Sequence, residues 1–109
     1  MVDIVDISDE TFEQEVLQVK GPVLVDFGAE WCKPCKQLDP IVEELAQEWG
    51  DRVKVVKIDS DANVSTTSRY MVMGLPTLIL FIDGEPTERL MGFKPRPKIE
   101  AVINPHLGS

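Results

Sequence analysis

The stretch Val23–Lys36, VLVDFGAEWCKPCK, runs from an apolar segment into two cysteines that are separated by two residues. Val23–Phe27 is apolar on both faces, which is typical of a central strand in a covered sheet, and strand alternation puts Asp26 on the same face as Leu24. A helix is expected to begin near Cys32, because a first helical turn tolerates proline. The stretch therefore predicts a buried strand that leads into a helix with two thiols at its start.

Two thiols at this spacing favour redox chemistry. Cys32 and Cys35 are the only cysteines of the chain, and the free N–H groups of a first helical turn stabilise a thiolate. Two structural interpretations compete. A zinc site needs about four ligands, and the other candidate, His106, is far along the chain. A structural disulfide over so short a loop would constrain the unfolded chain little. We therefore predict a redox-active pair rather than a metal site.

Length and charge limit the remaining possibilities. A chain of 109 residues fits a single domain, 1–109. The formal net charge of −8 argues against a nucleic-acid partner, since such proteins carry a basic surface. Residues 1–6 do not show the basic and then apolar pattern of a secretion signal, and no apolar run approaches the ~18 residues of a membrane span. We expect a cytoplasmic protein without a membrane partner.

The hydrophobic pattern elsewhere predicts alternating strands and helices. Ser8 is expected to cap a first helix that Gly21 and Pro22 end, Pro40 to kink the long helix, and the last helix to follow Pro97. The expected strands are residues 2–7, 23–27 and 53–58, the other helices are 32–49 and 59–70, and a hairpin joins 77–82 to 87–91 through a turn at 83–86. This order predicts an α/β fold, a mixed sheet with helices on both faces. The two cysteines would lie at the carboxyl end of a strand, where open α/β sheets place their chemistry.

Several motifs stand in the order and spacing of one known family. They are VDFGAEWCKPCK at residues 25–36, Pro40, VKID at 56–59, GLPTL at 74–78, and Gly92. In this combination, which spans nearly the whole chain, the sequence resembles the thioredoxin family. The resemblance implies the thioredoxin fold and dithiol–disulfide exchange with disulfide-containing protein substrates. It also implies a thioredoxin reductase as electron donor, a monomer, and no cofactor or metal beyond the cysteine pair.

The resemblance also implies roles for four residues. Cys32, nearer the helix start and solvent, is the attacking thiolate, and Cys35 is the resolving thiol. Asp26, if buried beside the pair, is expected to have a raised pKa and to accept or relay the proton of Cys35; the alternative is a capping carboxylate at the strand end. Lys57 is the implied partner of Asp26, with structural pairing and proton tuning both open.

A substrate-binding rim around Cys32 follows from the same resemblance. Its residues are Trp31, Pro34, Gly74, Leu75, Pro76, Gly92 and Phe93. Pro76 corresponds to the cis-proline of the family, and the backbone near Leu75 is expected to pair with an extended substrate segment. The alternative for Trp31 and Phe93 is that both are ordinary half-buried aromatic residues.

Three positions depart from the usual family pattern. Lys33 stands where glycine is typical, Gly28 where an aromatic residue is typical, and Phe93 where a small residue is typical. These departures leave the redox potential open. The expected function is a general protein-disulfide reductase, with two alternatives: a dedicated thiol donor or oxidant of the same fold, and a non-enzymatic subunit that binds partners through the apolar rim.

Overall fold

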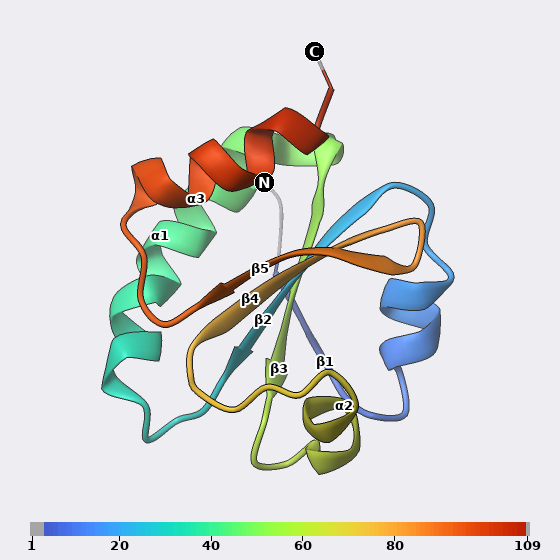
Figure 1. The fold of residues 1–109 in the computed structure, drawn as a ribbon, viewed down its shortest axis with the longest axis vertical. Coiled ribbons are helices and arrows are strands. Elements are labelled where there is room, and N and C mark those ends of the chain that lie inside the picture. Colours follow the sequence, from blue (N-terminus) through green and yellow to red (C-terminus); the bar gives the residue numbers. More distant parts are fainter. Residues whose placement is uncertain (1–3, 109) are drawn as a thin grey trace.

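The computed structural model describes residues 4–108, which form a five-stranded mixed sheet with helices on both faces (Figure 1). The strands follow the order β1-β3-β2-β4-β5 across the sheet. Their bounds are β1 Val5–Ile7, β2 Pro22–Gly28, β3 Lys54–Asp59, β4 Thr77–Ile82 and β5 Glu85–Met91. Strands β1, β3 and β2 are parallel, whereas β4 and β5 are antiparallel to their neighbours. The predicted fold class is confirmed, and the strand before the cysteines is central.

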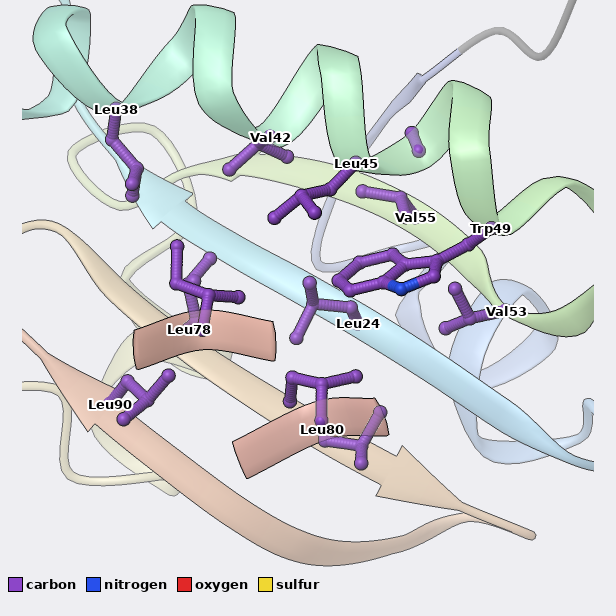
Figure 2. Packing of buried hydrophobic residues seen from close by; sticks show 13 residues of the cluster. Leu24, Leu38, Val42, Leu45, Trp49, Val53, Val55, Leu78, Leu80 and Leu90 are labelled. Carbon is purple, nitrogen blue, oxygen red and sulfur yellow. The ribbon is translucent and has the colours of Figure 1, made fainter. Parts of the chain in front are cut away.

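Helices α1 (Lys33–Trp49) and α3 (Arg96–Ile103) cover one face of the sheet. The apolar side chains of α1 lie on one stripe: Leu38, Val42, Leu45 and Trp49 are buried, and Ile41 is partly buried. In Figure 2 the labelled side chains of α1 point toward those of the strands. Trp49 also donates a hydrogen bond from its indole Nε1 to Asn104 Oδ1 at 2.9 Å. Burying this much apolar surface fixes the direction in which α1 leaves β2.

The opposite face is covered by a short π-helical turn, η1 (Glu13–Leu17), and by α2 (Val64–Arg69). The rings of Phe12, Tyr70 and Phe81 pack there with centroids 5.1 to 5.6 Å apart. The predicted cap at Ser8 is wrong, because the N-cap of η1 is Phe12. Ser8 lies in a preceding turn, where its N–H donates to Thr11 Oγ1.

The second helix is shorter than the predicted 59–70, because α2 begins only at Val64. Its start depends on a distant residue. Asp9 Oδ1 accepts the Thr66 N–H at 2.9 Å, and Asn63 Oδ1 accepts the Asp9 N–H at 2.8 Å. These contacts join segments more than fifty positions apart in the sequence. They satisfy N–H groups that the local sequence leaves open.

The first predicted helix is also shorter, because η1 spans only Glu13–Leu17, and the last helix begins at Arg96 rather than after Pro97. The boundaries of α1 and of β2 to β5 lie within one or two residues of the prediction. Helix α1 continues through Pro40 and ends in a 3-10 turn, η2 (Gly50–Arg52), and a similar turn, η3 (Asn104–His106), follows α3. The hairpin turn is shorter than predicted, because Asp83 and Gly84 both have positive φ angles, 50° and 82°, as a two-residue type I′ turn requires. Val2 and Asp3 of the predicted first strand lie outside the described residues. Within residues 4–108, no helix has both the length and the apolar character to cross a bilayer.

Strand register brings four separate segments to one edge of the sheet. Phe27 pairs with Thr77, Thr77 pairs with Met91, and Gly28 pairs with Asp59. The loop after β2, the loop after β3, the segment before β4 and the segment after β5 therefore meet at the same edge (Figure 1). The two cysteines lie at this edge.

Candidate redox site

The cysteine pair occupies the start of α1. Cys32 is the N-cap residue with extended backbone angles, and its Sγ accepts a hydrogen bond from the Cys35 N–H at 3.2 Å. Cys32 and Cys35 form a disulfide, with their Cα atoms 5.2 Å apart. His106 instead forms a hydrogen bond with Glu88 through Nε2 at 2.7 Å, and no cluster of metal-binding side chains is found within residues 4–108. The two sulfurs therefore meet in the bond that dithiol–disulfide exchange makes and breaks.

The two cysteines differ in their surroundings and not in their exposed fractions. Cys32 is 3% exposed and Cys35 is 5% exposed, so the expectation that Cys32 lies nearer to solvent is wrong for the disulfide form. Cys32 stands where the free N–H groups of the first turn converge, which favours a thiolate on its sulfur. Cys35 lies one turn further along and lines a pocket. Each sulfur therefore has its own electrostatic environment.

Asp26 lies deep in the central strand, 3% exposed, between Lys57 of β3 and Leu78 of β4. Burial raises the pKa of Asp26 to about 7, because a carboxylate is poorly solvated there. The Lys57 charge opposes this shift, and the Asp39 charge adds to it. The predicted burial and raised pKa are confirmed, and the Asp26 carboxyl can exchange a proton near neutral pH.

A pocket of about 360 Å³ is lined by both Asp26 and Cys35. Its lining residues are Asp6, Ile7, Asp26, Gly28, Ala29, Glu30, Cys35, Lys36, Asp39, Lys57, Ile58 and Asp59. A Cβ atom at Gly28 would lie 3.5 Å from Cys35 Sγ, in ordinary contact, so the glycine leaves room beside this sulfur. An aromatic side chain at Gly28 would occupy this space. The departure from the family pattern therefore leaves a space beside Cys35 that also reaches Asp26.

Lys57 is paired differently from what the resemblance implies. Its Nζ donates to Asp39 Oδ1 at 3.1 Å, and Asp26 acts on Lys57 only through its charge. Burial lowers the pKa of Lys57, but the hydrogen bond to Asp39 and the charges of Asp39, Asp26 and Asp6 outweigh burial, so that pKa lies above its ordinary value. Lys57 is therefore a permanent cation, held on the α1 side of the pocket.

The predicted rim lies on both sides of the cysteine pair. Trp31 is 70% exposed, so it is not the half-buried aromatic residue of the alternative interpretation. Its indole N–H donates to Asp61. Pro34 is also exposed, in the first turn of α1. The exposed Phe93 adds an apolar ring on the segment after β5.

The remaining rim residues form a hydrogen-bonded cluster before β4 and after β5. The Leu75–Pro76 peptide bond is cis, as the resemblance implies. The Gly92 N–H donates to the Pro76 carbonyl at 2.7 Å, and Thr77 Oγ1 donates to the Gly74 carbonyl at 2.7 Å. These bonds hold two loops together at the edge of the sheet that carries the cysteines.

Sequence reasoning did not identify Asp39 or three exposed methionines. Met71, Met73 and Met91 are among the most exposed apolar side chains, and Met91 Sδ lies 3.4 Å from the position of a Cβ at Gly74. Met91 directly precedes the predicted rim residue Gly92, and strand alternation exposes every second side chain, so the sequence held a signal for an exposed Met91. The signal for Asp39 is its position one helical turn after Cys35, which places both on one side of α1.

Comparison with known proteins supports a redox role for the cysteine pair. The thioredoxin family model matches residues 3–105. The thioredoxin of Bacillus subtilis is 47% identical over 104 residues, which covers 95% of this chain and 98% of that protein. Thioredoxin 1 of Synechococcus elongatus is 44% identical over 101 residues, covering 93% and 94%. A thioredoxin of Staphylococcus epidermidis is 42% identical over 104 residues, covering 95% and 98%. The chain therefore belongs to the thioredoxin family, as a thiol–disulfide oxidoreductase with Cys32 and Cys35 as its redox-active pair.

Proposed function

We propose that the protein is a general reductase of protein disulfides and that a thioredoxin reductase restores its dithiol. The observation that carries this proposal is the pocket lined both by Cys35 and by a buried carboxyl whose pKa is about 7. A carboxyl with this pKa exchanges protons at the pH where disulfide exchange must run. Family membership supports protein substrates and a reductase of the matching kind.

In the first step the Cys32 thiolate attacks one sulfur of a substrate disulfide. A Cys32–substrate disulfide forms, and the second substrate sulfur leaves as a thiolate that takes up a proton. The position of Cys32 at the N-cap of α1 supports this role, since the helix N-terminus favours the charged sulfur.

In the second step Cys35 attacks Cys32 Sγ and releases the substrate. The Cys35 thiol gives its proton to the Asp26 carboxylate through the shared pocket, the Cys32–Cys35 disulfide forms, and the other substrate sulfur leaves as a thiolate. This thiolate takes up the proton that Asp26 returns. The substrate has then gained two electrons and two protons. Lys57 tunes this transfer through its charge, which lowers the pKa of Asp26.

The rim and the exposed methionines supply the docking surface in this proposal. Trp31 and Pro34 flank the pair on the α1 side, and the cluster of Gly74, Leu75, Pro76, Gly92 and Phe93 flanks it on the β4 and β5 side. Backbone groups near Leu75 would pair with an extended substrate segment. Unbranched methionine side chains adapt to different partners, as a general reductase requires.

Insulin-disulfide reduction tests the proposed activity. With dithiothreitol as the electron donor, the wild-type protein should accelerate insulin precipitation, and the double variant Cys32→Ser/Cys35→Ser should match the rate without protein. A double variant with full activity would instead indicate a binding subunit.

The reduction potential separates a reductase from an oxidant. Equilibration with glutathione should give a value near the ~−270 mV of thioredoxin rather than the ~−120 mV of strong oxidants. The exposed Lys33 ammonium should make the reduction potential more oxidising by only ~10 to 20 mV, since its charge is screened by water.

The cellular setting belongs to the same proposal. A protein-disulfide reductase works where thiols are kept reduced, which supports the cytoplasm. We also expect a single domain and a monomer. Cell fractionation would check the location, and sedimentation would check the monomer.

A further inference from the structure

Three of the charged side chains that line the pocket, Asp26, Asp39 and Lys57, lie close enough to act on one another. Asp26 lies opposite Lys57 in the register of β2 and β3, and Asp39 approaches the same lysine from α1. The ammonium is hydrogen-bonded to Asp39, with Nζ and Oδ1 3.1 Å apart. The Lys57 and Asp39 side chains are 35% and 28% exposed, so water screens their attraction only in part.

Burial is the main cause of the raised pKa of Asp26, and the position of the lysine charge sets how far that pKa is lowered again. An ammonium paired directly with Asp26 would favour its carboxylate strongly. Asp39 competes for the same cation and brings a negative charge of its own, which favours protonated Asp26. Both the competition for Lys57 and the charge of Asp39 therefore raise the pKa of Asp26.

Other charged groups face this pocket from every element around it. They are Asp6 on β1, Glu30 in the loop before α1, Lys36 on α1 and Asp59 at the end of β3. Of the two lysines that line the pocket, Lys57 lies opposite Asp26 in strand register, and the hydrogen bond to Asp39 sets its position.

We propose that Asp39 is a positioning residue of the redox site: it holds the Lys57 ammonium on the α1 side of the pocket and so leaves the Asp26 carboxyl able to take up and return the Cys35 proton. This inference rests on the proposed role of Asp26. Asp39 touches neither the substrate nor the sulfurs in this scheme, and it acts through Lys57 and through its own charge. Its position on α1, one turn after Cys35, couples the helix that carries the dithiol to the proton acceptor on β2.

Carboxyl NMR titration of the oxidised protein tests the inference directly. Replacing Asp39 by Asn, or by Ala as a second variant, removes its charge and releases Lys57 toward Asp26. The Asp26 pKa should fall by about one pH unit, the effect of a unit charge in a partly hydrated pocket. The pH dependence of mixed-disulfide resolution should move by the same amount. Asp39→Glu should restore both values toward those of wild type.

Two further variants make the test specific. Glu43→Gln removes an exposed carboxylate from the same helix outside the pocket, so it changes the net charge equally and should move neither measurement. Lys57→Met removes the cation that Asp39 positions. In this background Asp39→Asn should change the Asp26 pKa by a smaller amount, which a double-mutant cycle measures.

The outcomes separate this inference from the proposed function. An unchanged Asp26 pKa in Asp39→Asn and Asp39→Ala, in a protein that still reduces insulin, would overturn the positioning role and leave the reductase function intact. A shifted titration with an unmoved pH profile would overturn the proton-transfer role of Asp26. A wild-type protein that fails to reduce insulin would overturn the proposed function, whatever Asp39 does to the titration.

Discussion

At the scale of single residues, Cys32 and Cys35 are distinguished by their neighbours. Cys32 caps α1, whereas Cys35 faces the pocket that contains Asp26. The first sulfur is therefore placed to meet a substrate as a thiolate, and the second is placed next to a proton acceptor. The two side chains are almost equally buried, so their exposed fractions do not reveal this difference.

Single cysteine variants should therefore behave differently. Cys35→Ser should accumulate mixed disulfides with substrate proteins, because Cys32 still attacks and nothing resolves the product. Cys32→Ser should accumulate few, because Cys35 lacks the helix N-cap position. Non-reducing gels after reaction with an oxidised substrate measure the two yields, and equal trapping by both variants would contradict the assigned roles.

Asp26 should make the stability of the fold depend on pH. Its folded pKa, about 7, lies above the model value of 3.8. A raised pKa means that the stabilising contribution is complete below the unfolded pKa and is lost as pH rises through the folded value. Asp26→Asn should therefore be more stable than wild type above pH 7, by the order of 4 kcal/mol, and nearly equal to it at pH 4. It should also reduce disulfides more slowly.

Urea unfolding of the oxidised protein at several pH values measures this effect. Asp51→Asn, which alters an exposed carboxylate, should show no such dependence. A stability gain of Asp26→Asn that is the same at pH 4 and pH 9 would exclude a buried titrating carboxyl as its cause.

At the scale of elements, the β4–β5 turn is fixed by its contact with the segment that precedes β2. The Asp83 N–H donates to the Gly21 carbonyl at 3.2 Å, and Asp83 Oδ1 accepts the Gly21 N–H at 2.7 Å. Gly84, with a φ angle of +82°, lies against the Leu17 carbonyl, so a Cβ there would be only 2.6 Å from that oxygen. The turn is therefore specified by backbone conformation and by close approach together.

Gly84→Ala should consequently cost more than Gly21→Ala. Both glycines have positive φ angles, +87° at Gly21, but nothing lies within 4 Å of a Cβ at Gly21. The backbone term alone is ~1 to 2 kcal/mol, and the backbone clash at Gly84 should add ~1 to 3 kcal/mol. Thermal or urea denaturation of both variants measures the difference, and equal losses would show that the contact with Leu17 relaxes at no cost.

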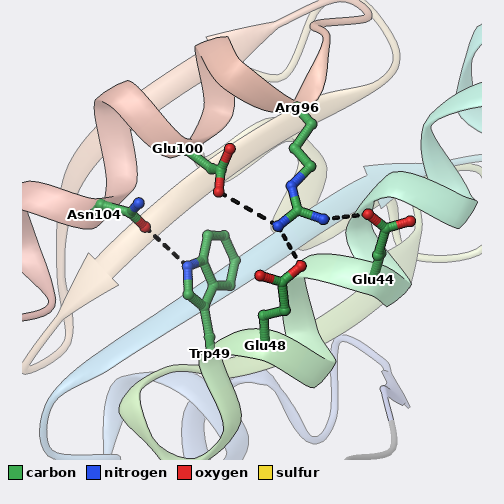
Figure 3. Close-up of polar contacts among 6 residues, drawn as sticks. All are labelled: Glu44, Glu48, Trp49, Arg96, Glu100 and Asn104. Carbon is green, nitrogen blue, oxygen red and sulfur yellow. Dashed lines mark hydrogen bonds and ion pairs between the residues drawn. The ribbon is translucent and has the colours of Figure 1, made fainter.

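At the scale of the whole molecule, α1 and α3 share the core on one face of the sheet and are also joined by polar contacts. Figure 3 shows Arg96 of α3 reaching Glu44 and Glu48 of α1, with Glu100 3.5 Å from the same guanidinium. The hydrogen bond from Trp49 to Asn104 lies beside this network. Because α1 carries the dithiol, these contacts hold the redox helix against the C-terminal helix.

Arg96→Gln should lower the midpoint of thermal denaturation at low salt. The difference from wild type should shrink at 0.5 M salt, because the network is near the surface and ions screen it. Lys98→Gln, an exposed cation on the same helix, is the control and should change the midpoint little. A loss in Arg96→Gln that does not depend on salt would point to lost packing of the arginine stem instead.

The sequence by itself determined the strong features of this protein. The apolar run of β2 and the two thiols after it predict the central strand and the redox helix. The resemblance to the family rests on motifs spread along the chain, from residues 25–36 to Gly92. Burial of apolar residues at a regular spacing is a local signal, and it survives any detail of packing. The same pattern predicts a buried Asp26, since strand alternation leaves that side chain no exposed face.

Only the tertiary structure decided which polar groups meet. The lysine that the family resemblance pairs with Asp26 is hydrogen-bonded to Asp39, and Asp9 accepts an N–H of the first turn of α2 from 57 positions earlier in the chain. Such pairs depend on how helices lie on the sheet within a few ångströms, and hydrogen bonds between distant residues leave no period in the sequence. Packing brings α1 against β2 and β3, and that contact assembled the charges around the Asp26 carboxyl.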